Sequence, residues 1–170
     1  MQELSLRSYS WIHSRSEYKQ LWDLSQLHWL ELENNFRDFI GQSDGVPPSD
    51  LPRLESLNIH GRGFDDEEVE DLELARKDMS IFLGGLAKLK KLKIEFQYWD
   101  EITSLESLAA TAGETLEKIR LRDTRYVSEG DNFIRSTSLS NLSILKNSFP
   151  QLTYLGLDAA LKRPEVSLAL

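Results

Sequence analysis

The stretch Leu86-Ala-Lys-Leu89-Lys-Lys-Leu92-Lys-Ile94 decides the fold, because its spacing of apolar residues recurs along the chain. Residues 24–32 and 51–59 repeat the pattern L-x-x-L-x-x-L-x-[LI] in full. Residues 113–121 and 149–157 match it at all but the first position, and residues 1–6 carry a truncated copy. Self-similarity of this kind predicts stacked structural units, each of which buries its apolar side chains against its neighbours.

The third apolar position of each copy anchors one unit, which gives six anchors: Leu4, Leu30, Leu57, Leu92, Ile119 and Leu155. Their intervals fall into a short class of about 27 residues and a long class of about 35 residues. From Met1 to about Asp158 the pattern resembles the leucine-rich-repeat family. The unit lengths resemble its ribonuclease-inhibitor-like branch, which includes the repeat regions of F-box substrate receptors. The family's asparagine after the strand is matched by Asn35, whereas the other copies hold Arg62, Gln97, Thr124 and Ala160 there.

This resemblance implies an α/β solenoid of about six repeats, with parallel strands on its concave face and helices or irregular segments on its convex face. Parallel strands stack about 4.8 Å apart, while helix axes need about 8–10 Å, so the strands belong inside the curve. A doubly wound α/β sheet is the alternative, but its strands read as continuous apolar runs. Here they read Leu-Glu-Leu-Glu, Leu-Asn-Ile-His and Ile-Arg-Leu-Arg. The alternation favours the solenoid.

Four segments outside the strands have helical signals. The run Ser14-Arg-Ser-Glu17 has capping-box spacing. Apolar residues from Val69 to Leu86 step by three and four behind an acidic run, and Gly84-Gly85 should end that helix. A third helix is expected to open at Asp100 and close at Gly113, and a fourth should lie within residues 134–149. Residues 41–50 and 123–131 are expected to be loops. The acidic run, residues 65–73, would alternatively be a docking segment.

The composition of the chain limits its domain organisation, its compartment and its kinds of partner. The chain has 170 residues, 40% of them hydrophobic, which fits one domain over residues 1–170. It has no cysteine, no apolar run of about 18 residues and no signal-peptide pattern, so we expect an intracellular protein, cytoplasmic or nuclear, without a membrane partner. A net charge of −8 argues against nucleic-acid binding. Because solenoid ends need caps and the repeat pattern begins at Met1, we expect a fragment of a longer array.

Signals of catalysis are weak. Gly41-Gln-Ser43-Asp-Gly45 matches G-x-S-x-G, but a nucleophile elbow needs a helix directly after it, and Val46-Pro47-Pro48 follows instead. His13, His28 and His60 lack closely spaced ligand partners, and a zinc site needs three or four converging ligands. We therefore expect no enzyme, no cofactor and no metal. A reactive Ser43 would be the sign of an enzyme.

Strand alternation yields the candidate site, because residues that flank the buried leucines point to the other face. Five of the six such positions on the fourth and fifth strands are basic, and aromatic residues stand on the second and sixth strands. The predicted partner-binding residues are Trp29, Lys91, Lys93, Lys118, Arg120, Arg122 and Tyr154. Tyr98, Trp99 and Tyr126 are further aromatic candidates. The plain alternative is a solvated sheet face.

Like charges on adjacent strands are destabilising, which favours a partner that neutralises them. We expect that partner to be a protein with an acidic or phosphorylated segment, bound by a recognition module. The family resemblance implies the substrate-binding part of an F-box-type ubiquitin-ligase adaptor. The competing interpretation is a structural or oligomerising segment of a larger assembly with no ligand of its own.

Overall fold

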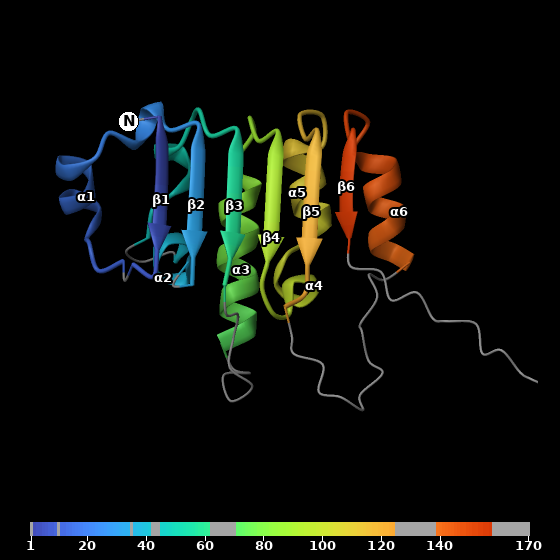
Figure 1. Cartoon of the computed structure of the whole chain (residues 1–170), viewed down its shortest axis with the longest axis horizontal. Helices are drawn as coiled ribbons and strands as arrows, with labels where there is room; N and C mark the ends of the chain where they lie inside the picture. Colours follow the sequence, from blue (N-terminus) through green and yellow to red (C-terminus); the bar gives the residue numbers. More distant parts are fainter. Residues whose placement is uncertain are drawn as a thin grey trace, which may run out of the picture.

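The computed structural model describes residues 2–9, 11–34, 36–41, 45–61, 71–124 and 139–157. Six parallel strands form one sheet whose order follows the chain, as Figure 1 shows. The strands are β1 (Glu3–Arg7), β2 (Trp29–Glu33), β3 (Ser56–His60), β4 (Lys91–Glu95), β5 (Lys118–Arg122) and β6 (Tyr154–Leu157). The predicted α/β class and the six parallel strands are confirmed. In a doubly wound fold the strand order reverses within the sheet, whereas here it runs from β1 to β6 without a reversal.

The repeat pattern sets the register of the sheet. The six anchors form one continuous row, from Leu4 on β1 to Leu155 on β6. A second apolar row, two residues later on each strand, runs beside it from Leu6 to Leu157. On β2 to β5 every residue of both rows is at most 2% exposed. Because strand side chains alternate between faces, this register directs all the polar residues of these strands to the opposite face.

The helices that lie between the first and the last strand in Figure 1 cover the apolar face of the sheet and lie behind it in that view, while the first and the last helix lie beside β1 and β6. They are α1 (Arg15–Leu21), α2 (Phe36–Ile40), α3 (Asp71–Gly84), α4 (Trp99–Ile102), α5 (Leu105–Ala112) and α6 (Leu139–Ser148), with 3₁₀ turns at Leu24–Gln26 and Pro48–Asp50. In the described part of the chain no helix combines the length and the apolar character needed to cross a membrane.

Two of the helix signals hold in detail. Ser14 caps α1, because its backbone N–H and its hydroxyl both donate to the Glu17 carboxylate at 2.8 Å. The Ser14 backbone and hydroxyl bonds hold the pKa of Glu17 below its usual range. Helix α3 ends at Gly84, as the Gly84-Gly85 pair predicts, while residues 62–70 and the start of the acidic run lie outside the described residues.

The single helix expected between Asp100 and Gly113 is wrong, since α4 and α5 are two helices. Thr103 is extended, and the Ser104 hydroxyl accepts a hydrogen bond from the Ser107 N–H at 3.1 Å, which caps a new helix. The segment from Phe36 to Ile40, for which no helix is predicted from the sequence, forms the short helix α2, on which Phe36, Phe39 and Ile40 are all buried.

Candidate functional site

The face of the sheet that the helices leave uncovered is here called the open face. Its residues form three rows in register across the strands. The first row is Glu3, Trp29, Ser56, Lys91, Lys118 and Tyr154; the second is Ser5, Glu31, Asn58, Lys93, Arg120 and Gly156; the third is Arg7, Glu33, His60, Glu95 and Arg122. The structure thus brings all seven predicted partner-binding residues onto one face, with Trp29 two strands away from the basic residues.

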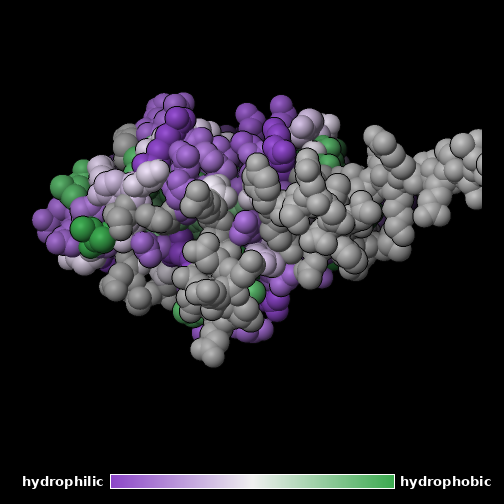
Figure 2. All heavy atoms as spheres, turned by 60° about the horizontal axis from the view of Figure 1, so that its bottom comes forward, coloured by the Kyte–Doolittle hydropathy of each residue, from purple (hydrophilic) through white to green (hydrophobic). Residues whose placement is uncertain are grey.

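Charge on the open face is segregated by strand. The open-face residues of β1 and β2 include three carboxylates and one guanidinium, so these two strands carry a net charge of −2. The open-face residues of β4 and β5 include five cations and one carboxylate, so these two strands carry a net charge of +4, whereas the whole chain has a net charge of −8. Figure 2 turns the open face toward the top of the picture, and hydrophilic side chains gather along that edge. The basic half of this face is therefore a local feature that opposes the charge of the whole protein.

The acidic half contains a buried carboxylate. Glu31 is 7% exposed and accepts hydrogen bonds from Ser5 Oγ, from Asn58 Nδ2 at 2.9 Å and from Arg7 Nη2 at 3.3 Å. His60 Nε2 lies 3.2 Å from Glu31 Oε1, the oxygen that also accepts from Asn58. The Ser5 hydroxyl, helped by His60 and Arg7, holds the pKa of Glu31 below its usual range despite its burial. This cluster ties β1, β2 and β3 together. A glutamate between two leucines gave no sign of these partners in the sequence.

Replacing Glu31 by alanine should lower the free energy of unfolding by about 1–3 kcal/mol near pH 7, because Asn58 and His60 lose the acceptor that compensates their burial. Since the pKa of Glu31 is depressed in the folded state, its contribution is present above the unfolded pKa, about 4.3. It is lost as the pH falls through the folded pKa, so the wild type and the variant should converge in acid. Urea unfolding at several pH values measures both effects.

The matched control is Glu33→Ala, on the same strand and face. Glu33 lies 4.0 Å from Arg7, and its side chain is 32% exposed, so its loss should cost only about 0–1 kcal/mol. Equal losses for the two variants, or a difference that does not shrink in acid, would contradict the buried-carboxylate account.

The positive charge of the basic half is partly compensated in its second row. Glu95 on β4 lies 2.7 Å from Lys93 Nζ and 2.8 Å from Arg120 Nε, so one carboxylate bridges a cation on each of the two strands. Glu95 is also the register neighbour of Arg122. The positive charges of Lys93 on β4 and Arg120 on β5 thus share one carboxylate, that of Glu95 on the same face of the sheet. The repulsion between Lys93 and Arg120 is therefore reduced within the protein itself, without an acid from a partner.

The first row has no such compensation. Lys91 and Lys118 are register neighbours and both are exposed. Neither lysine lies within ion-pair distance of a carboxylate in the part of the chain that the structure describes. Tyr154, 51% exposed, lies next to Lys118 in the register, and its ring covers Gly156: a Cβ built there would meet Tyr154 Oη at 3.1 Å and Arg120 Cγ at 3.3 Å. The first row thus has two exposed lysines on neighbouring strands, and Tyr154 follows Lys118 on the next strand.

The other predicted residues fall elsewhere. Trp99 is 4% exposed and belongs to the core, so it cannot anchor a partner at the surface. Tyr98 is half-buried in the bend after β4. Ser43 and Tyr126 lie outside the described residues. Among the residues that are described, no group of three or more His, Asp or Glu side chains could hold a metal ion.

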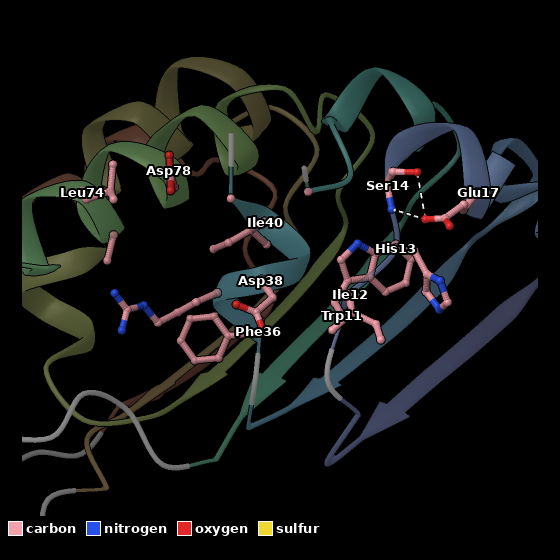
Figure 3. A pocket seen from close by; sticks show the side chains of 14 residues that line it. Trp11, Ile12, His13, Ser14, Glu17, Phe36, Asp38, Ile40, Leu74 and Asp78 are labelled. Carbon is pink, nitrogen blue, oxygen red and sulfur yellow. Dashed lines mark hydrogen bonds between the residues drawn. The ribbon is translucent and has the colours of Figure 1, made fainter. Parts of the chain in front are cut away.

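A cleft of about 740 Å³ opens on the helix-covered side, and no sequence pattern predicted it. Figure 3 shows Leu74 and Asp78 of α3 on one side, the segment from Trp11 to Glu17 on the other, and Phe36, Asp38 and Ile40 of α2 between them. Burial raises the pKa of Asp78. Ser14 and Glu17 are engaged in the α1 cap, so these two described residues do not form a free pair of nucleophile and base in the cleft.

Comparisons with models of protein families, with curated proteins and with solved structures find no match for this chain. The resemblance to leucine-rich-repeat proteins therefore stays a prediction from the repeat spacing.

Proposed function

We propose that this chain is a leucine-rich-repeat solenoid that recognises another protein through the open face of its sheet. The repeated, in-register strands and the placement of the helices on one face support the solenoid. The observation that carries the function is the segregation of charge: β4 and β5 present a net +4 on a protein of net charge −8. An acidic segment of a partner is the complementary ligand.

Charge alone would give weak binding that salt abolishes, because each exposed ion pair contributes only about 0–1 kcal/mol. Specific affinity needs aromatic anchors that become buried at the interface. Trp29 and Tyr154 lie in the same row as Lys91 and Lys118, one on each side of them. An acidic segment that crosses the strands would contact both aromatic side chains.

The family resemblance supports a more specific role within this proposal, the substrate-binding part of an F-box-type ubiquitin-ligase adaptor in the cytoplasm or nucleus. One observation favours the alternative, an oligomerising segment. Leu155 on β6 is 42% exposed and Leu142 on α6 is 40% exposed, whereas the equivalents of Leu155 on β2 to β5 are at most 2% exposed. Another copy or a neighbouring domain would cover such an end.

The test is the binding of acidic peptides selected from a random 12-residue display library on the wild-type protein. We expect the variant Lys91→Gln, Lys118→Gln, Arg120→Gln to bind them about tenfold more weakly at low salt, because three positive charges leave the open face and two of them, on Lys91 and Lys118, have no carboxylate partner among the described residues. The control is Lys77→Gln, Lys88→Gln, Lys146→Gln, which changes the net charge equally at exposed residues away from the open face.

Equal weakening in the two variants would show that net charge, not the open face, drives binding. Unchanged binding in the open-face variant would remove this face from the proposal. A mass in light scattering that rises with concentration, and is the same for both variants, would favour the oligomerising segment.

A further inference from the structure

Two pairs of cations stand side by side on the open face, and they differ in one respect. Each pair joins a residue of β4 to its register neighbour on β5, Lys93 to Arg120 in the second row and Lys91 to Lys118 in the first. Over the second-row pair lies the carboxylate of Glu95, within 2.8 Å of both cations. The first-row pair has no carboxylate over it in the described part of the chain. The two pairs thus have the same register between β4 and β5, but among the described residues only the second-row pair has a bridging carboxylate.

We propose that a glutamate or aspartate side chain of the partner bridges Lys91 and Lys118 as Glu95 bridges Lys93 and Arg120. This inference rests on the proposed function and identifies the ligand and its place on the open face. A carboxylate is the ligand that the second row already holds between the same two strands. Neighbouring parallel strands are about 4.8 Å apart, so two flexible lysine side chains reach one carboxylate from either side.

The rest of the first row sets the length of the segment. Trp29 on β2 and Tyr154 on β6 lie on opposite sides of the lysine pair. Four strand intervals separate them, about 19 Å, which an extended chain covers in about six residues. The bridging carboxylate is expected near the middle of such a segment, with apolar or aromatic residues toward the two ends.

The experiment measures fluorescence anisotropy of a fluorescein-labelled hexaglutamate peptide with four variants of the whole chain. Lys91→Glu, Lys118→Glu should weaken binding at least tenfold. Ser56→Glu should do the same, because it places an internal carboxylate beside Lys91 in the first row. Lys93→Glu, Arg120→Glu should weaken binding about threefold or less, since Glu95 already occupies that pair. Lys88→Glu, Lys146→Glu carries the same change of net charge and should have the smallest effect. Circular dichroism checks that each variant is folded, and Lys91→Gln, Lys118→Gln replaces the reversal if that variant unfolds.

The outcomes separate this inference from the proposed function. A larger loss for the second-row pair than for the first-row pair would overturn the Lys91–Lys118 site and leave the open face as the binding surface. Equal losses for the first-row pair and the Lys88–Lys146 control would overturn both. A wild-type protein that binds a phosphoserine hexapeptide but not hexaglutamate would overturn the carboxylate as the ligand.

Discussion

Replacing Leu92 by alanine is expected to lower the free energy of unfolding by about 2–5 kcal/mol, the cost of removing a large aliphatic side chain from a packed core. Leu92 is 2% exposed and lies at the centre of the anchor row, between Leu57 on β3 and Ile119 on β5. No polar group replaces the lost contacts, so the cavity left behind adds to the lost hydrophobic burial. Urea unfolding followed by circular dichroism gives the change.

Leu155→Ala is the matched control, because Leu155 occupies the same row on β6 but is 42% exposed. Much of its surface stays in contact with water in the folded protein, so we expect a loss of about 1 kcal/mol or less. If the two variants lose equal stability, Leu155 is covered in solution by something other than the described residues, which would support the oligomerising alternative.

The strands were predictable because a repeated pattern gives several independent readings of one structural unit. Leu30, Leu57 and Leu92 each mark a strand, and the alternation of polar residues around them defines the open face. The break between α4 and α5 was not predictable from the same kind of evidence. Apolar periodicity continues from Ile102 to Leu105, whereas the backbone is extended at Thr103 and Ser104, and the Ser104 hydroxyl caps the second helix.

The candidate site was predictable in position but not in charge balance. Strand alternation correctly places Lys93 and Arg120 on one face. The compensation of their charge depends on the side-chain conformation of Glu95, whose carboxylate pairs with Lys93 on its own strand and with Arg120 on β5. Strand alternation does not specify that conformation. Glu31 illustrates the same limit, because its partners come from β1 and β3 at sequence separations of 24 to 29 residues.

The bends that follow the strands show where family analogy and geometry diverge. The resemblance assigns the bend after β2 to Asn35, which lies outside the described residues. The preceding residue, Asn34, adopts a left-handed conformation at φ 64°, and its N–H donates to the His60 carbonyl at 2.9 Å. Its side-chain Nδ2 donates to Ser8 Oγ at 3.2 Å. Asn34 thus joins its own bend to those after β1 and β3.

Gly61, in the bend after β3, packs against Asn34 and should tolerate no side chain. Its φ of +134° is a conformation that residues with a Cβ rarely adopt, and a Cβ there would lie 2.6 Å from Asn34 N. Its own N–H donates to the Glu95 carbonyl at 3.1 Å. Gly61→Ala should therefore destabilise the protein by about 1–3 kcal/mol through backbone strain alone, and by more if Asn34 is displaced.

Gly84→Ala, the contrasting variant, should stabilise the protein by up to about 1 kcal/mol, because alanine restricts the unfolded chain more than glycine does. Gly84 is the last residue of α3, and a Cβ there would meet its nearest neighbour, Thr111 Oγ1, at 4.0 Å. Opposite signs of the two changes in thermal and urea unfolding are the expected result. A neutral Gly61→Ala would mean that the bend relaxes freely, and the three bends joined through Asn34 would then not hold the edge of the open face in place.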